Sequence, residues 1–404
     1  MVDSLKQAYR DYLVDLIRFP SLTGQEEACA RYVLDSLKAL GVEAYIDAAG
    51  NVVGELRRGK GPAVLLNTHL DVVAPGNEDA WRPYTPFGGD VDGDLVIGRG
   101  ASDIKGGLAA QFFAFKRFKE ALDAGRSFEG TLLFSAVVHE EAAEMLGMRA
   151  LIEETLPRRG QPVDLCIVGE PTGGLAALGQ RGKVEIAVTT RGKTAHSSEP
   201  ALGINALEKM IPVTRYVFEE MPLQFKAGTP QALNSVTITD CVVKPGRMSV
   251  IPDLCEISID RRYMPGEELS ALLAEFEGLF DRLRAADPDF KAAAVPRSYR
   301  EKTWTGYERE VIKYHPPWNT DPDLPIVKKA LAGLEKTGQN PQRLFWKFGT
   351  DGSMTAALHH IPTIGYSHGG IEWAHQPQER VSLTEMCKTV EGTFAMAAEV
   401  LKLT

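Results

Sequence analysis

The sequence has few cysteines, and their arrangement excludes two kinds of site. Five cysteines are scattered over 404 residues, and no two of them form a Cys-x-x-Cys pair. An odd number with this spacing argues against a disulfide framework and against a thiolate metal site. We therefore expect a protein of a reducing compartment, the cytoplasm.

Long apolar runs and basic runs are also missing. No stretch approaches the roughly 18 apolar residues that a membrane helix needs. The N-terminal residues mix charged side chains with Leu, Ile and Val at helical spacing, so they lack the apolar centre of a secretory signal. The formal net charge is -9, and no Lys/Arg run resembles a phosphate-binding stripe. We expect neither a membrane nor a nucleic acid as a partner.

Several apolar runs are short and nearly continuous. They predict strands buried on both faces, as in a mostly parallel sheet covered by helices. These runs are 63–66, 131–138, 165–168 and 362–366. Helices are predicted over 4–18, 24–40 and 106–123. For the second of these, Ser21 and Thr23 are candidate caps and Gly41 is the expected end.

The segment between about residues 183 and 296 has a different pattern. Apolar and polar residues alternate there with a period of two, which predicts a sheet with one buried face. With helices over 204–221 and 267–286, the order becomes strand, helix, strand, strand, helix, strand. That order is typical of ferredoxin-like domains.

These patterns divide the chain into two predicted domains, as its length also favours. We predict an α/β catalytic domain formed by residues 1–182 and 297–404. An inserted ferredoxin-like α+β domain, 183–296, interrupts it. Residues 297–322, rich in Pro, Trp and Tyr, are predicted to form a long ordered connection.

Each apolar run of the catalytic domain leads into side chains that can bind a divalent metal. These side chains are His69, Asp71, Glu140, Glu141, Glu170, His368, Glu372 and His375. In doubly wound sheets the carboxyl ends of the strands share one edge, so distant residues can meet there. Asp103 stands in a glycine-rich stretch directly before the helix predicted over 106–123.

Taken singly, each candidate also has a simpler explanation. His69 and Asp71 could form a local hydrogen bond, Glu140 and Glu141 could be a solvated strand end, and His375 could be a surface histidine. The set as a whole favours a metal site. Two adjacent acids directly after a fully apolar strand are costly to bury unless a cation offsets their charge.

The residue types indicate the chemistry. Two histidines and three carboxylates without a thiolate suit two zinc, cobalt or manganese ions. A carboxylate such as Asp103 can bridge the two ions, and Asp71 would accept a hydrogen bond from the His69 imidazole and orient it. One member of the Glu140–Glu141 pair would bind metal. The other would move a proton from water to the leaving nitrogen.

Seven ordered elements resemble acetylornithine deacetylases and succinyl-diaminopimelate desuccinylases, with similarity to aminoacylases and glutamate carboxypeptidases. The elements are Asn67-Thr-His-Leu-Asp-Val-Val, Gly98-Arg-Gly-Ala-Ser-Asp-Ile-Lys-Gly, Glu140-Glu141, Gly169-Glu-Pro-Thr, Gly192-Lys-Thr-Ala-His-Ser, Ile251-Pro-Asp and Ala374-His-x-x-x-Glu. They span nearly the whole chain. The stretches 179–182, 258–262 and 304–306 resemble the selenium-metabolism-linked hydrolase subgroup.

This resemblance implies a role for each matching metal-site residue. His69 and Glu170 would hold one metal, and Glu141 and His375 the second. Asp103 would bridge the two metals, and Glu140 would be the general base. Zinc is the expected metal, with cobalt or manganese as alternatives.

The resemblance also implies a homodimer formed through the inserted domain. His196 would reach the active site of the partner subunit and stabilise the oxyanion, and Arg262 would bind a substrate carboxylate. Gly349 and Thr350 complete the expected substrate-binding residues. The simpler alternatives are a solvated loop histidine for His196 and a strand salt bridge for Arg262.

Three departures from the family pattern leave all proposed ligands in place. His139 replaces the usual Asp before the glutamate pair, Met248 and Ser249 stand where asparagines are common, and residues 368–370 read His-Gly-Gly instead of Gly-Pro-Gly. We expect all three to lie where the substrate is recognised.

The predicted function is hydrolysis of the amide bond of a small N-acyl amino acid or a related carboxylate-bearing substrate. Alternatives with the same chemistry are a dipeptidase or carboxypeptidase and an N-carbamoyl (ureido) amidohydrolase. A catalytically silent metal-binding scaffold is the alternative from a different class. The pair Glu140–Glu141 argues against a silent site, which has no need for the acid that binds no metal.

Overall fold

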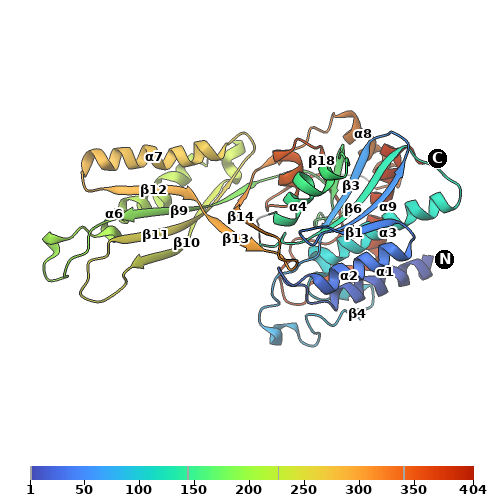
Figure 1. Ribbon diagram of the computed structural model, residues 1–404, viewed down its shortest axis with the longest axis horizontal. Helices are drawn as coiled ribbons and strands as arrows, with labels where there is room; N and C mark the ends of the chain where they lie inside the picture. The colour runs from blue at the N-terminus through green and yellow to red at the C-terminus, as the bar shows by residue number, and fades with distance from the viewer. Residues whose placement is uncertain (1, 143–144, 226, 340–341) are drawn as a thin grey trace.

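The computed structural model describes residues 2–142, 145–225, 227–339 and 342–404. Figure 1 shows an elongated molecule with two lobes, and both chain termini lie in the larger one. The larger lobe is an α/β domain around a mixed sheet, and the smaller lobe has a separate sheet. The predicted fold class is therefore confirmed. In the described part of the chain, no helix combines the length and the apolar character needed to cross a membrane.

The sheet of the larger lobe has nine strands. Its order is β1-β2-β6-β3-β7-β18-β8-β16, with β17 beside β8. The bounds are β1 Glu43–Ile46, β2 Val52–Arg58, β3 Ala63–His69, β6 Gly130–Val137, β7 Leu165–Val168, β8 Ala176–Gln180, β16 Trp318–Asn319, β17 Arg343–Trp346 and β18 Thr363–Gly365. The four central strands, β6, β3, β7 and β18, run parallel. Their carboxyl ends therefore lie along one edge.

Both faces of this sheet are covered, which explains the continuous apolar runs. Leu66 and Phe134 pack on one face with helices α1 Val2–Ile17, α2 Glu27–Ala39, α3 Gly106–Asp123, α8 Pro325–Glu335 and α9 Leu383–Leu401. Their chain neighbours Leu65 and Leu133 pack on the other face, against residues of α4 Leu146–Ala150 and the turns that follow it. Successive strand residues thus enter opposite cores.

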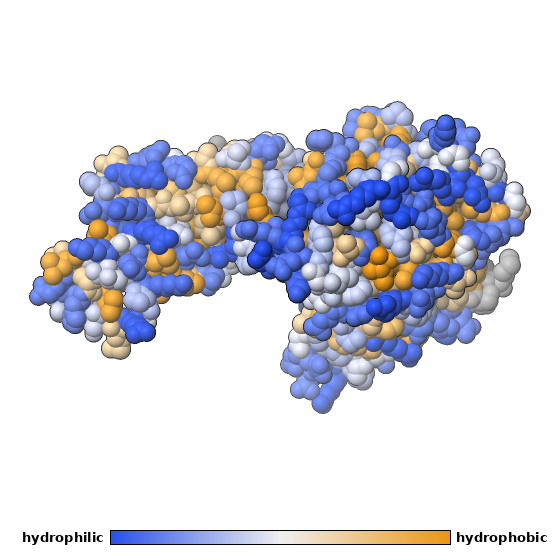
Figure 2. All heavy atoms as spheres, in the orientation of Figure 1, coloured by the Kyte–Doolittle hydropathy of each residue, from blue (hydrophilic) through white to orange (hydrophobic). Residues whose placement is uncertain are grey.

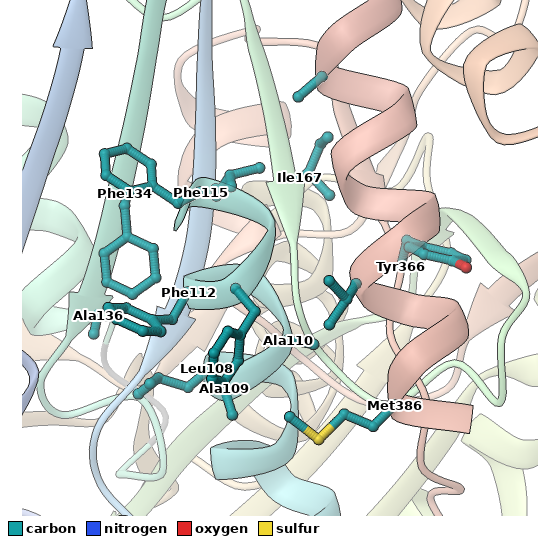
Figure 3. Close-up of a cluster of buried hydrophobic side chains, with 14 of the residues drawn as sticks. Leu108, Ala109, Ala110, Phe112, Phe115, Phe134, Ala136, Ile167, Tyr366 and Met386 are labelled. Atoms are coloured by element: carbon teal, nitrogen blue, oxygen red, sulfur yellow. The ribbon is translucent and has the colours of Figure 1, made fainter. Parts of the chain in front are cut away.

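Aromatic side chains fill the core between α3 and β6. The ring centroids of Phe115 and Phe134 are 5.9 Å apart, and those of Phe112 and Phe134 are 6.4 Å apart. Figure 3 shows these three rings beside one another in the cluster. Phe115 is 0% exposed, so its truncation would leave a cavity that the surrounding helices and strands cannot fill.

We expect Phe115→Ala to lower the free energy of unfolding by about 3–5 kcal/mol. All five tryptophans lie outside residues 183–296, so tryptophan fluorescence during urea unfolding reports on the catalytic domain alone. Val91→Ala is the control, because Val91 is 44% exposed and its truncation should cost no more than about 0.5 kcal/mol. Equal effects of the two substitutions would contradict this assignment of the core.

The prediction that Ser21 and Thr23 cap the second helix is wrong, and their side chains form other hydrogen bonds. α2 begins after Glu26, and no side chain caps it. The Ser21 hydroxyl donates to the Leu70 carbonyl (2.6 Å), and the Thr23 hydroxyl donates to the Asp71 carboxylate (2.8 Å). These bonds tie the segment before α2 to the end of β3. Gly41, with a φ of +70°, follows the helix as predicted.

The smaller lobe has the predicted succession of elements. These are β9 Gly182–Arg191, α6 Ala206–Arg215, β10 Ser235–Lys244, β11 Leu254–Tyr263, α7 Leu269–Ala286 and β12 Lys291–Pro296. The strands are antiparallel in the order β10-β11-β9-β12, and both helices pack against the same buried face. The first helix is shorter than the predicted 204–221, because wider and tighter turns (η5 Tyr216–Glu220 and η6 Met221–Gln224) follow it. The boundaries at 183 and 296 stay predictions.

The connection after β12 has structure that the sequence did not reveal. It contains a hairpin of β13 Ser298–Lys302 and β14 Glu308–Ile312. β15 Tyr314–His315 then pairs with β9 of the smaller lobe, and β16 pairs with β8 of the larger one. The connection therefore joins the two sheets.

Candidate metal centre

The strand ends bring the predicted metal ligands to one edge of the sheet. His69 is the last residue of β3, Glu140 and Glu141 follow β6, and Glu170 follows β7. Asp103 lies directly before α3. Because β6, β3 and β7 are parallel neighbours, their carboxyl ends place these side chains together.

Two sets of ligand atoms form around His69. Its Nε2 lies 3.4 Å from Asp103 Oδ1, 3.4 Å from Glu170 Oε1 and 3.9 Å from Glu140 Oε2. Ligand atoms of His69, Glu140 and Glu170 lie within 4.8 Å of one another, and so do those of His69, Asp103 and Glu141.

His375 completes the cluster from the other side of Asp103. Its Nε2 lies 3.4 Å from Asp103 Oδ2 and 3.0 Å from Glu141 Oε2. The two oxygens of Asp103 therefore face different histidines, Oδ1 toward His69 and Oδ2 toward His375. A carboxylate in this position can bind one cation with each oxygen.

These spacings fit metal ligands. Ligand atoms about 2.0–2.1 Å from one zinc ion lie roughly 3.3–3.4 Å from each other at tetrahedral angles. His69 Nε2 and Glu141 Oε1 are buried and have no hydrogen-bond partner among the described residues. Imidazole and carboxylate ligands without a thiolate suit zinc, cobalt or manganese.

The electrostatics of the cluster also favour cations. Burial, and after it the Glu170 carboxylate, raises the pKa of Glu140 well above its usual range. Burial, and after it Asp103, raises the pKa of Glu141 and of Glu170 to about 7. Asp103 departs in the other direction, because His375 and His69 outweigh its burial and hold its pKa low. The crowded carboxylates therefore resist ionisation until positive charge joins them.

Asp71 orients His69 in a way that differs from the prediction. The closest acceptor of His69 Nδ1 is the backbone carbonyl of Asp71, at 2.9 Å, whereas the Asp71 carboxylate lies at 3.5 Å. That carboxylate instead accepts from the backbone N–H groups of Glu140 and Glu141, both at 3.1 Å, and from the Thr23 hydroxyl. It therefore fixes the glutamate pair as well as the histidine.

Glu379 fixes Asp103, a role that the sequence did not predict. Glu379 Oε1 accepts from the backbone N–H groups of Ser102 and Asp103, both at 2.8 Å. Its other oxygen pairs with Arg99 at 2.6 Å, and both side chains are fully buried. The available signal was its place four residues after His375 in the quoted motif.

The cluster opens into a cavity of about 410 Å³. The predicted metal ligands that line it are Asp103, Glu141, Glu170 and His375, with Glu140 beside them. The other lining residues are Lys183, Arg262, His315, Phe348, Gly349, Ile371, Ala374 and Gln376. Lys183 and Arg262 belong to the smaller lobe, so both lobes contribute to the wall.

Two of the three predicted substrate-binding residues line the cavity, and the third lies behind its wall. Arg262 lines the cavity, and its guanidinium also pairs with Asp260 at 2.6 and 3.2 Å. Gly349 lines the cavity as well. Thr350 is fully buried, and its hydroxyl donates to Gln180 Oε1 at 2.6 Å, so it supports the wall from behind.

His196 lies away from this cavity within one chain. It stands in the exposed loop after β9, and its Nδ1 is 2.8 Å from the Ser198 hydroxyl. β9 leaves the larger lobe at Gly182, so this loop follows the strand's far end, in the outer part of the smaller lobe (Figure 1).

The departures from the family pattern also lie off the cavity. His139 and His368 are each 3% exposed, and Met248 is 95% exposed on the smaller lobe. None of the three is among the described residues that line the cavity. The expectation that these departures lie where the substrate is recognised stays a prediction.

Known proteins are similar to this chain in sequence or in fold. Residues 65–399 match Peptidase family M20/M25/M40. Protein YgeY of Escherichia coli (strain K12) is 32% identical over 377 residues, which cover 91% of this chain and 88% of YgeY. A succinyl-diaminopimelate desuccinylase of Xylella fastidiosa (strain M23) is 30% identical over 280 residues, 67% of this chain and 72% of the relative. The crystal structure of aminopeptidase PepT from Bacillus cereus ATCC 10987 aligns with a TM-score of 0.73 and 21% identity over 98% of both chains.

The matched region includes every residue of the metal cluster, from His69 to His375. The resemblance inferred from the seven sequence elements is thereby confirmed. The chain belongs to peptidase family M20/M25/M40 and is a metal-dependent amide-bond hydrolase.

Proposed function

We propose that the chain cleaves the amide bond of a small N-acyl amino acid, or a related substrate with a carboxylate, at a centre of two divalent cations. The observation that carries this proposal is the position of Asp103 between His69 and His375, in the lining of a cavity that Lys183 and Arg262 also line. Zinc is the metal that we expect, with cobalt or manganese as alternatives.

Each ligand has one place in this proposal. His69 and Glu170 would hold one cation, Glu141 and His375 would hold the other, and Asp103 would contribute an oxygen to each. The contacts described above support this division. When bound, divalent cations supply Lewis-acid activation of water and of the substrate carbonyl.

Glu140 is the proposed general base. Glu140 is 9% exposed and lines the same cavity as the ligands, while Asp71 fixes its backbone N–H. It accepts a proton from the attacking water and returns that proton to the leaving nitrogen. Asp71 and Glu379 act as positioning residues, the first for His69 and the glutamate pair and the second for Asp103.

We propose that the chain forms a homodimer through the smaller lobe. Figure 2 shows apolar patches among polar ones on the visible face of that lobe. Large apolar side chains are exposed on the smaller lobe. They include Leu202, Leu207, Ile211, Phe218, Leu223, Val242 and Met248. In such a dimer, His196 would reach the cavity of the partner subunit and stabilise the oxyanion there.

A mixture of two inactive variants tests the shared site. After subunit exchange, His196→Ala mixed with Glu140→Gln should recover about a quarter of wild-type activity. Half of the dimers are then hybrids, and one of their two sites has both groups intact. Each variant alone is the control. If mass-labelled subunits are shown to exchange but no activity is recovered, the proposal of a site shared between subunits is wrong.

A substrate panel tests the proposed function itself. Metal-reconstituted protein should hydrolyse N-acyl amino acids in preference to dipeptides and N-carbamoyl amino acids, and a chelator should stop the reaction. A preference for dipeptides would favour a dipeptidase or carboxypeptidase, and one for ureido acids a carbamoyl amidohydrolase. The desuccinylase of Xylella fastidiosa supports the acyl class. If the protein hydrolyses no class of substrate in a chelator-sensitive way, the catalytically silent metal-binding scaffold becomes the favoured function.

We also propose that the protein works in the cytoplasm. The five cysteines support this location, because the structure describes all of them as free thiols.

A further inference from the structure

A second cavity lies beside the segment that leads to His375. Its volume is about 510 Å³, and its wall is formed by residues from the segment 368–373, from β5 Leu95–Ile97, from β19 Arg380–Ser382 and from the first turn of α9. None of its described lining residues also lines the cavity of the metal cluster. It is therefore a separate cavity, with charged, polar and apolar groups of its own.

Arg380 brings an unmatched positive charge to this cavity. Its Nε donates to the Gln378 carbonyl at 3.0 Å, and its Nη2 donates to Gln378 Oε1 at 3.3 Å. Its guanidinium carbon lies 4.3 Å from the centroid of the Trp373 ring. These partners are neutral, and no carboxylate in the described part of the chain pairs with Arg380. The guanidinium is thus held in place while its charge stays available to an anion.

Glu372 brings an unmatched negative charge. It is exposed, and among the described residues its carboxylate has no ion pair and no hydrogen bond. A side chain at position 370 would collide with this carboxylate, so Glu372 can fold back over the cavity wall only because Gly370 is a glycine. The other carboxylate of the lining, Glu385, is paired with Lys388 at 2.8 Å. The cavity therefore offers one free carboxylate beside one free guanidinium.

His368 adds a polar ring that lacks a partner. It is 3% exposed, and neither ring nitrogen forms a hydrogen bond with any described residue. Burial lowers the pKa of His368 to about 3, so the ring is neutral at physiological pH and has one N–H to donate. A buried polar ring of this kind is costly unless a ligand or water satisfies it. His368 is also one of the three departures from the family pattern.

Apolar groups form another part of the lining. Leu95 is half-buried, Val381 is 3% exposed, and the Trp373 ring is half-buried beside them in the wall. An aliphatic or aromatic side chain placed here would lose apolar surface to water contact and gain from it. A free α-amino acid with an apolar side chain has all three complementary groups, an anion, a cation and an apolar end.

The cavity wall is connected to the metal centre through short contacts. Trp373 precedes His375 by two residues, and its N–H donates to the Gly370 carbonyl at 3.0 Å. The Ser102 hydroxyl donates to the same carbonyl at 3.1 Å, and Ser102 directly precedes Asp103. A ligand that restrains this wall would therefore also restrain the segments that carry His375 and Asp103.

We propose that this cavity binds a free α-amino acid with an apolar side chain and that its occupancy slows hydrolysis. The carboxylate of the ligand lies at Arg380 and accepts from His368, and its ammonium group lies at Glu372. Its side chain packs against Leu95 and Trp373. The inference rests on the proposed function only for the source of the ligand, because hydrolysis of an N-acyl amino acid releases such a molecule. The acylated substrate has no ammonium group, so this site would distinguish product from substrate.

Trp373 provides a direct signal for binding. Titration of the metal-loaded protein with L-leucine should change its tryptophan fluorescence with a Kd of about 0.1–1 mM, the range expected for so small a ligand. In Trp373→Phe this change should disappear, although calorimetry still detects binding. A fluorescence change that is lost in Arg262→Met and kept in Arg380→Gln would place the ligand in the catalytic cavity and overturn the inference.

Two truncated ligands separate the charged contacts. Isocaproate is leucine without its ammonium group, and isoamylamine is leucine without its carboxylate. Arg380→Gln should weaken leucine and isocaproate about 10-fold and leave isoamylamine unchanged. Glu372→Gln should weaken leucine and isoamylamine by about 3- to 5-fold, because Glu372 is exposed, and leave isocaproate unchanged. Arg343→Gln is the matched control, since Arg343 is exposed and does not line this cavity.

His368→Phe tests the buried ring. It keeps an aromatic ring without a donor and should weaken leucine about 3- to 10-fold. The temperature of thermal unfolding should not fall, because the histidine nitrogens have no described partner to lose. A lower unfolding temperature with unchanged leucine binding would assign the ring to the fold and remove it from the site.

Inhibition measures the connection to the metal centre. Leucine should lower kcat for an N-acyl amino acid without changing KM, and this inhibition, relative to each variant's own uninhibited rate, should vanish in Arg380→Gln. No inhibition at saturating leucine would exclude the regulatory effect. If the protein hydrolyses nothing in the substrate panel but binds leucine in this pattern, the proposed function fails and the site stands. If it hydrolyses acyl amino acids and neither charged variant alters leucine binding, the site fails and the hydrolase stands.

Discussion

Glu140→Gln lowers kcat by about 10²–10⁴-fold, the usual contribution of a general acid–base group, while the protein keeps its divalent cations. Glutamine has nearly the same shape as glutamate but cannot accept the proton from water. The backbone of residue 140 stays fixed by Asp71, so the fold around the site should not change. Steady-state kinetics and metal analysis of the purified variant measure the two quantities.

The neighbouring residue provides the matched comparison. Glu141→Gln changes the same group one position later, yet Glu141 is the proposed ligand that lies 3.0 Å from His375. We expect this variant to lose about one metal per chain together with activity. If Glu140→Gln loses metal and Glu141→Gln keeps it, then Glu140 is the metal ligand and Glu141 is the general base. Full activity of Glu140→Gln would exclude a general-base role for it.

Removal of the metals should reduce hydrolysis by at least about 10³-fold, because water is then no longer activated for attack at neutral pH. Dialysis against a chelator, followed by metal analysis, prepares the metal-free protein. Thermal unfolding of this protein should occur at a lower temperature than that of the loaded protein, because ligands that bind only the folded state stabilise it. Buried carboxylates whose pKa is raised to about 7 must otherwise remain protonated or repel one another.

Titration of the metal-free protein with zinc, cobalt or manganese counts the sites. Activity should rise to a plateau at about two equivalents per chain, as expected for Asp103 with one oxygen toward each histidine. A plateau at one equivalent would contradict the dinuclear centre. An Asp103→Ala variant should bind both cations more weakly, since it lacks the shared ligand.

The central sheet and its metal ligands could be predicted because each depends on local patterns. The run 165–168 became β7 and the helix over 106–123 became α3, since burial on both faces or along one helix requires apolar residues at fixed spacings. His69, Glu140 and Glu170 each follow a buried strand, and parallel strands bring such residues to one edge. The alternating pattern likewise predicted the smaller sheet.

The parts that could not be predicted depend on contacts between distant residues or on backbone geometry. The hairpin β13–β14 is mostly exposed, so its residues carry little apolar signal. The pairing of Lys183 with His315 joins two strands far apart in sequence, and no local pattern records it. The closest partner of His69 is a carbonyl of residue 71, and the residue type at that position does not reveal where its carbonyl points.

The smaller lobe enters and leaves the larger one at neighbouring points. β9 and β12 are hydrogen-bonded strands, and the Arg297 N–H donates to the Glu185 carbonyl at 2.8 Å, so the two crossings of the chain lie side by side. From the viewpoint of the larger domain, the whole insertion is one surface loop whose ends already meet. Closing such a loop with a few residues has only a small entropic cost. Evolution could therefore lengthen, exchange or delete this lobe while the strand ends that carry the proposed metal ligands keep their positions.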